Sequence, residues 1–308
     1  MPSYRIALFL HDRLNDYQAL LRTDCEQVAR RHDLQVSVHS ADKSAETQLR
    51  QIRQELAEPE NVRPRAFVIC PVSEMALMPL IHDTAKAGIA WVMVSRWNDA
   101  IHDFRRQYPK VPIFAVLPDH VEIGRIQGQQ LRLVLAPGDE IVYIAGPLGT
   151  YSTRGRRLGI EQELSDKTDV RWSCFNGDWS ELGGEQAMKS WLSTFPIRKL
   201  PRFVIAAQND AMAMGARQAF LDWGAAGGQV PKGELRVYGC DGSPSYGQRL
   251  VTSSQLSATI VIPPVAGRAV EEIVAAFRTG QKPDAEIKIH VRSLPNLEAL
   301  AAAGRRKA

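Results

Sequence analysis

Short apolar runs, each about as long as a β-strand, recur along the chain with helical patterns between them. The runs are residues 6–10, 66–70, 90–94, 141–145, 203–207 and 235–240. Runs that are apolar at nearly every position are typical of strands buried on both faces of a parallel sheet. The helical spacing is clearest after the first run, at Tyr17, Leu20, Leu21, Cys25 and Val28. This alternation predicts an α/β chain with doubly wound parallel sheets.

The series of strands and helices begins again at Glu140, which predicts two lobes rather than one large sheet. The elements after Asp241 are too few for a third domain, so we divide them between the lobes. The expected division is an N-terminal lobe of residues 1–117 and 262–283, a C-terminal lobe of residues 118–261 and 284–295, and a helical tail of residues 296–308. The two doubly wound lobes are therefore joined by a hinge that the chain crosses more than once.

Length and charge narrow the classes of partner. The chain has 308 residues, of which 44% are hydrophobic, and its 38 basic residues nearly balance 34 acidic ones. This length suits about two domains, and the charge balance gives no basic surface of the kind that binds nucleic acid. The longest apolar runs fall far short of the roughly 20 residues that span a membrane. We expect neither a nucleic-acid partner nor membrane insertion.

The start of the chain carries no secretory signal pattern. The first predicted strand begins a few residues after Met1, without the basic stretch, apolar core and cleavage site of a signal peptide. Two expectations stay open on this ground: a signal segment lies outside this chain, or the protein stays in the cytoplasm.

Polar and aromatic residues follow the predicted strands, where ligands bind in open α/β sheets. The candidate ligand-binding residues are Asn15, Asp16, Tyr17, Ser95, Arg96, Arg154, Trp179, Asn209 and Asp241. Carboxylate, amide and guanidinium groups suit sugar hydroxyls, which donate and accept hydrogen bonds at once. An indole ring can stack on the apolar C–H face of a sugar. The set therefore favours a polyhydroxylated ligand.

Two motifs carry a family resemblance. Residues 208–216 read QNDAMAMGA and residues 238–244 read YGCDGSP. With this spacing the chain resembles the type I periplasmic sugar-binding proteins, the ribose- and galactose-binding group, over roughly residues 4–291. Their ligand domain is shared with the lactose-repressor family.

The resemblance implies a non-enzymatic, monomeric solute-binding protein in the periplasm. Its two lobes would close by a hinge motion on one monosaccharide or similar small polar ligand. The closed form would be presented to the membrane permease of an ABC transporter or to a sensor receptor.

The resemblance also gives each candidate residue a role. It implies that Asn15 and Asp16 lie in the first-lobe sugar loop, Arg96 at the end of the fourth strand, Arg154 at the mouth of the second lobe, Trp179 at a stacking position, and Asn209 and Asp241 as hydrogen-bonding partners.

Three positions depart from the family pattern. Residues 15–18 read Asn-Asp-Tyr-Gln instead of Asn-Pro-aromatic-aromatic, Ser95 replaces the acidic residue before Arg96, and Ile262 stands where Gln is usual in the hinge. Tyr17 is then the residue left for first-lobe stacking. Two arginines facing a site that is short of one carboxylate leave open an acidic sugar or another small anion as the ligand.

Structural roles compete with these assignments. The Asn and Asp candidates also suit helix caps and turns, Trp179 suits ordinary packing, and the two arginines suit structural ion pairs or a solvated helix face. Outside the sugar-binding group, an intracellular or sensory ligand-binding protein remains an alternative, either a repressor-like effector domain without its DNA-binding part or a partner of a chemoreceptor or kinase.

An enzyme is the other class considered. The glycine-bearing stretch at residues 146–159 lacks the G-x-G-x-x-G spacing, and the chain has neither a phosphate loop with Lys-Ser/Thr nor a G-x-S-x-G elbow. The seven histidines show no metal-binding spacing. We therefore expect no catalytic residue, no cofactor and no metal.

Overall fold

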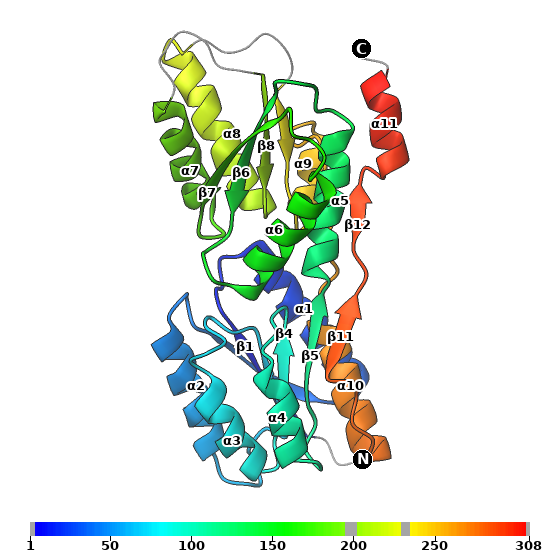
Figure 1. Cartoon of the computed structure of the whole chain (residues 1–308). Coiled ribbons are helices and arrows are strands. Elements are labelled where there is room, and N and C mark those ends of the chain that lie inside the picture. Colours follow the sequence, from blue (N-terminus) through cyan, green and yellow to red (C-terminus); the bar gives the residue numbers. More distant parts are fainter. Residues whose placement is uncertain (1–3, 195–201, 229–234, 306–308) are drawn as a thin grey trace. The chain divides into compact units, whose positions relative to one another are not determined.

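The computed structural model describes residues 4–194, 202–228 and 235–305. The chain divides into two compact units, the first formed by residues 1–118 and 263–289 and the second by residues 119–262 and 290–308. The chain passes between the units after Pro118, Ile262 and Ile289. Each unit has its own parallel sheet (Figure 1).

The first unit contains a six-stranded parallel sheet in the order β11-β5-β4-β3-β1-β2. The strands are β1 (Arg5–Leu10), β2 (Gln35–Ser40), β3 (Ala66–Ile69), β4 (Ala90–Val94), β5 (Ile113–Pro118) and β11 (Glu286–Ile289). Helices α1 (Asp16–Arg31) and α10 (Ala266–Thr279) pack together on one face, and α2 (Ala45–Ala57), α3 (Met78–Lys86) and α4 (Ala100–Gln107) follow one another on the other face (Figure 1). The strands β3, β4 and β5 are buried at every position, as their apolar sequences predict.

The second unit contains a four-stranded parallel sheet in the order β7-β6-β8-β9, and a separate antiparallel pair, β10 with β12. The strands are β6 (Glu140–Ala145), β7 (Arg171–Asn176), β8 (Phe203–Ala207), β9 (Arg236–Tyr238), β10 (Thr259–Val261) and β12 (Arg292–Leu294). The helices are α5 (His120–Arg132), α6 (Tyr151–Glu163), α7 (Glu181–Ser193), α8 (Asp210–Ala225), α9 (Gly247–Thr252) and α11 (Leu297–Arg305). Helix α5 packs on α6, and α7 packs on α8 on the opposite face of the sheet.

The α/β class and the two parallel sheets confirm the predicted fold. One predicted boundary is wrong: residues 284–295 do not all belong to the second unit. Strand β11 pairs in parallel with β5, with Ile287 opposite Val116, and so completes the sheet of the first unit. The physical reason is the unpaired side of β5, which a half-buried strand can cover. The second unit receives β12 and α11, and Leu300 of α11 lies in its core.

No helix among the residues that the structure describes is both long enough and apolar enough to cross a membrane.

Candidate functional site

Arg156 lies at the carboxyl edge of the second unit's sheet, beside Asp241. Its Nη2 atom is 3.5 Å from Oδ1 of Asp241, and the two side chains are 7% and 19% exposed. Its Nη1 atom donates a hydrogen bond to the carbonyl oxygen of Gln208. Its guanidinium carbon lies 5.6 Å from the ring centre of Trp179, within the range of a cation–π contact. Three candidate features, a cation, a carboxylate and an indole, therefore meet in one place.

Arg156 was missed by the sequence reasoning, which chose Arg154. Both residues are on α6, but Arg154 is exposed and Arg156 is buried. The buried positions of this helix include Thr153, Arg156 and Ile160, which follow helical spacing. That spacing was visible in the sequence and marks Arg156 as the buried arginine, whereas the contact of Arg154 with a ligand stays a prediction.

Glycines bring α6 close to α5 and so set the position of Arg156. A Cβ atom at Gly124 on α5 would lie 1.9 Å from the carbonyl oxygen of Arg156, and one at Gly159 on α6 would lie 2.0 Å from the carbonyl oxygen of Val121. Any larger residue at either position would push the two helices apart. The close helix pair therefore fixes the base of the Arg156 side chain.

Gln208 directly follows β8, and its side chain forms several hydrogen bonds at this edge of the sheet. Its side-chain Nε2 donates to the hydroxyl of Tyr143 at 2.8 Å and to the carbonyl of Thr153 at 3.0 Å, and its Oε1 accepts from the amide of Gly146 at 2.9 Å. Its side chain is fully buried. The backbone carbonyl that holds Arg156 is thus rigidly placed.

Asn209 forms a side-chain hydrogen bond to the backbone of Trp179. The side-chain Nδ2 of Asn209 donates to the carbonyl of Trp179 at 2.9 Å, and its Oδ1 accepts from the amide of Met212 at 2.9 Å as the N-cap of α8. Trp179 has a φ of 71°, and its ring lies over Gly146, where a Cβ would be 2.2 Å from the ring. Asn209 therefore has the capping role that competed with ligand binding, and its contact with a ligand stays a prediction.

Asp210 shapes the turn that carries Asp241. Its carboxylate accepts hydrogen bonds from the amide of Gly242 at 2.8 Å and from the hydroxyl of Thr259 at 2.6 Å. Burial, and then the nearby charge of Asp241, raise the pKa of Asp210 well above its ordinary value. Asp241 itself has a φ of 96°. Asp210 is a structural residue, and it holds Asp241 in a left-handed conformation beside Arg156.

In the first unit, Arg96 lies at the carboxyl edge and pairs with Glu74. Its Nη1 atom donates to Oε1 of Glu74 at 3.1 Å, and the two side chains are 7% and 16% exposed. Ser95 is buried, has a φ of 63° and donates its amide to the carbonyl of Val116 at 2.9 Å. Ser95 therefore ends β4 in a turn that directs Arg96 towards the loop of Glu74. Glu74 was not among the predicted site residues.

The other first-unit candidates lie at the start of α1. Asn15 is the N-cap, and its Oδ1 accepts from the amide of Gln18 at 3.1 Å. Tyr17 is mostly buried and donates its hydroxyl to the carbonyl of Pro263 at 3.1 Å. Asp16 occupies the first turn and is half-buried. The structure gives Asn15 the capping role, and ligand contacts from these three residues remain predictions.

His11 is a further residue at this edge that the sequence reasoning did not select. It follows β1 directly, and loss of solvent, together with the charge of Arg96, lowers its pKa from 6.5 to about 4. Its imidazole is therefore neutral at neutral pH and able both to donate and to accept a hydrogen bond. Its place at the end of the first buried strand was the signal available in the sequence.

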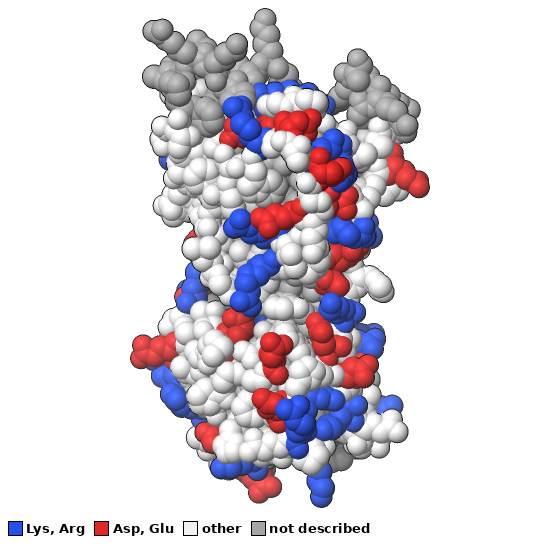
Figure 2. Space-filling model, viewed as in Figure 1, with Lys and Arg blue, Asp and Glu red and all other residues white. Residues whose placement is uncertain are grey.

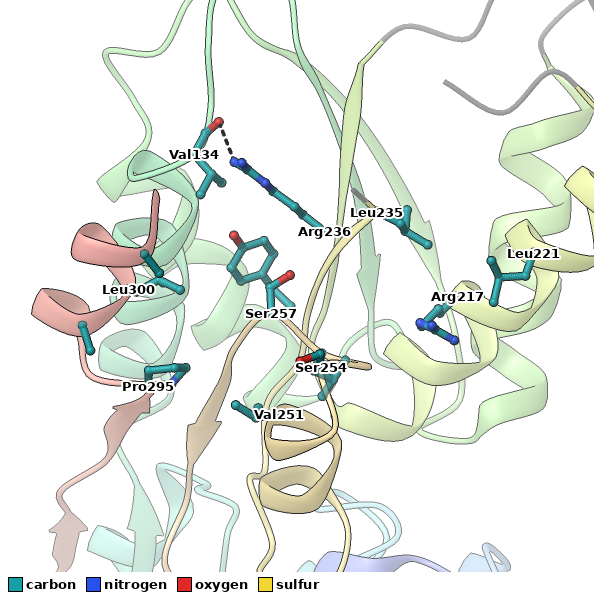
Figure 3. Close-up of a pocket in the computed structure, with 14 residues that line it drawn as sticks. Val134, Arg217, Leu221, Leu235, Arg236, Val251, Ser254, Ser257, Pro295 and Leu300 are labelled. Carbon is teal, nitrogen blue, oxygen red and sulfur yellow. Dashed lines mark hydrogen bonds between the residues drawn. The ribbon is translucent and has the colours of Figure 1, made fainter. Parts of the chain in front are cut away.

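The second unit also has a hollow of about 440 Å³ beside β9, and Arg236 and Tyr238 of this strand line it. Figure 3 shows Arg217 and Arg236 on different sides of this strand, with Arg236 directed towards Val134. The guanidinium of Arg236 donates to the carbonyl of Val134 at 3.5 Å. The two arginines do not converge on one point, so we place the candidate site at the carboxyl edges.

Among the described residues, no group of three or more His, Cys, Asp or Glu side chains is placed to hold a metal ion.

A comparison with known protein families shows which family this chain belongs to. The family model of the periplasmic binding protein domain matches residues 6–282. The chain belongs to this family. The match extends over residues of both units and confirms the resemblance to periplasmic binding proteins.

Two curated relatives match part of the chain at moderate identity. The ribose import binding protein RbsB of Escherichia coli is 26% identical over 212 residues, which cover 68% of each chain. The D-ribose/D-allose-binding protein of Pseudomonas aeruginosa is 28% identical over 200 residues, which cover 63% of this chain and 58% of that protein.

Solved structures of periplasmic binding proteins share the fold over nearly the whole chain. A galactofuranose binding protein superposes with a TM-score of 0.80 at 16% identity, covering 98% of this chain and 99% of its own. The binding component of an arabinose transporter from Shewanella sp. ANA-3, bound to L-arabinofuranose, gives a TM-score of 0.80 at 20% identity, covering 98% and 96%. The fructose binding periplasmic domain of a hybrid two-component system gives 0.76 at 20% identity, covering 98% and 95%.

Proposed function

We propose that this chain is a solute-binding protein that captures a monosaccharide, or a similarly small polar ligand, for delivery to an ABC transporter. The observation that carries the proposal is the cluster of Arg156, Asp241 and Trp179 at the carboxyl edge of the second unit's sheet. A guanidinium and a carboxylate bond sugar hydroxyls in complementary ways, and an indole stacks on the apolar face of a sugar ring. Arg96 and Glu74 offer a matching charged pair at the edge of the first unit.

The relatives support the ligand class. Two of them are described as binding ribose or allose, and a structural neighbour holds an arabinofuranose. We propose that one ligand contacts residues of both units, and that flexing of the three connecting segments closes the units on it. Such a protein performs no catalysis, works as a monomer in the periplasm, and has the transporter's permease as its partner.

A sensory role is the second candidate. It is favoured by the similarity to the sugar-binding domain of a hybrid two-component system. In that role the ligand-bound form would contact a receptor in place of a permease. Uptake of a radiolabelled sugar by vesicles containing the cognate permease separates the two roles, because only the transport role requires this protein for uptake.

Thermal-shift screening against sugars, polyols, sugar acids and other small polar solutes tests the proposal. We expect at least one carbohydrate to raise the melting temperature by several degrees at saturation, because a ligand that binds only the folded state stabilises it. Arg156→Ala should lose this shift. A panel in which no carbohydrate or sugar acid changes the melting temperature contradicts sugar capture.

A further inference from the structure

Glu74 supplies the negative charge beside Arg96, although it comes from a different loop. The residue before Arg96 is the uncharged Ser95, so the immediate neighbour provides no carboxylate. The distance from Glu74 Oε1 to Arg96 Nη1 is 3.1 Å, and both side chains are largely buried. Charges buried to this degree are stable in the protein when each neutralises the other. The first unit's edge is therefore not short of a carboxylate.

The backbone before Glu74 is held in place by the protein itself. Gln48, fully buried on α2, donates its Nε2 to the carbonyl of Cys70 at 3.0 Å and accepts from the amide of Val72 at 2.9 Å. The two bonds clamp the segment that leaves β3. Glu74 thus reaches Arg96 from a fixed loop, without help from a ligand.

Other charged groups at the edge of each unit are also paired within that unit. In the first unit the Nζ atom of Lys43 lies 3.9 Å from Oδ2 of Asp12, and in the second unit Arg156 pairs with Asp241. Arg154 is exposed, so water screens its charge. On the face shown in Figure 2, positive and negative side chains are intermingled within each unit. An anionic ligand would find each buried arginine already engaged by a carboxylate.

We propose that Glu74 determines specificity for charge: it favours neutral sugars and polyols and rejects sugar acids. This inference rests on the proposed function. A neutral sugar donates a hydroxyl to Glu74 and accepts from Arg96, so the ion pair stays intact. A sugar acid places a second carboxylate beside Glu74, and two like charges at a partly buried site repel each other strongly.

Isothermal titration with chemically matched probes tests this role. The neutral probes are D-ribose, D-galactose, D-glucose and xylitol, and the acidic probes are D-ribonate, D-galacturonate, D-glucuronate and D-xylonate. The variant Glu74→Gln keeps the side-chain shape and an accepting oxygen, but removes the charge. Glu26→Gln is the matched control, because Glu26 forms an exposed ion pair with Arg22 on α1 of the same unit.

We expect the wild type and Glu26→Gln to bind at least one neutral probe and to bind its acidic counterpart at least about tenfold more weakly. Glu74→Gln should shift the ratio of acid affinity to neutral affinity by about tenfold or more towards the acid. Because this readout is a ratio within one protein, a general loss of stability does not imitate it. Glu74→Asp should restore the preference for the neutral probe.

Two results overturn the inference and leave sugar capture standing. One is a wild type that binds an acidic probe at least as tightly as its neutral counterpart. The other is an unchanged ratio in Glu74→Gln. If no probe of either charge binds the wild type, and no carbohydrate or sugar acid of the thermal-shift panel raises its melting temperature, the proposed function fails and the role of Glu74 fails with it.

Discussion

Two buried arginines occupy comparable edges of two sheets, yet the protein holds them differently. Arg156 extends from within a helix, bonds to the carbonyl of Gln208, pairs with Asp241 and lies near the ring of Trp179. Arg96 lies two residues after β4 and pairs with Glu74 from a different loop. Three groups contact the guanidinium of Arg156, whereas the guanidinium of Arg96 is paired with Glu74 alone among the contacts of the described residues given above. We infer that the second unit orients the ligand and the first selects its charge.

The largest expected effect is the difference in protein stability between the Arg156→Ala and Arg96→Ala variants. Arg156→Ala should lower the free energy of unfolding by about 3 to 5 kcal/mol, because it removes the ionic partner of Asp241 and a donor to a buried carbonyl. Arg96→Ala should cost about 1 to 3 kcal/mol, because a single ion pair is lost. Urea unfolding followed by tryptophan fluorescence measures both. Equal losses would show that the two edges are held equally firmly.

The next effect is the dependence of stability on pH that His11 contributes in the first unit. The pKa of His11 is about 4 in the folded protein and near 6.5 in the unfolded chain. As the pH falls, His11 therefore takes up its proton first in the unfolded chain, which lowers the free energy of unfolding. The stabilisation is complete above pH 6.5 and is lost as the pH falls through 4, with a loss of about 2 kcal/mol by pH 5.

His11→Gln, which cannot take up this proton, should flatten the decline between pH 7 and pH 5. The groups that act on His11 are Arg96 and Lys43, which lower its pKa, and Asp12, which raises it. Urea unfolding of both proteins at the two pH values measures the difference. Parallel curves for the wild type and His11→Gln would contradict this role for His11.

The two helix-capping asparagines give a smaller contrast. Asn15→Ala removes one cap and should cost about 1 kcal/mol, while Asn209→Ala also removes the bond to the Trp179 carbonyl and should cost about 2 kcal/mol. Aspartate keeps the accepting oxygen but cannot donate. In urea unfolding, Asn15→Asp should therefore regain full stability and Asn209→Asp only part of it. Full recovery of stability in both variants would contradict a stabilising role for the hydrogen bond between Asn209 and the Trp179 carbonyl.

The smallest effect concerns Arg154. Because its side chain is exposed, Arg154→Ala should change stability by less than about 0.5 kcal/mol and affinity for a responding sugar by less than about threefold. Isothermal titration beside Arg156→Ala makes the comparison. A tenfold loss of affinity in Arg154→Ala would return Arg154 to the ligand site.

The sequence predicted the fold well because strands buried on both faces have a strong apolar pattern. It missed the pairing of β11 with β5, since the half-buried run EIKI carries no signal of which sheet edge it covers. The sequence placed Arg96 and Asp241 just beyond the ends of buried strands, where the structure also has them, after β4 and β9. Their contact with a ligand stays a prediction. Glu74 was missed because its partner is 22 positions away, and such a pairing depends on how two loops meet.

The central proposal is that one ligand contacts residues of both units. Isothermal titration of a responding sugar into the wild type, Arg96→Ala and Arg156→Ala tests it most directly. We predict one ligand per chain in the wild type and at least a hundredfold weaker binding in each variant, because a hydrogen-bonded charged group is removed from one side of the ligand. Wild-type affinity in either variant would place the ligand on a single unit and contradict the account.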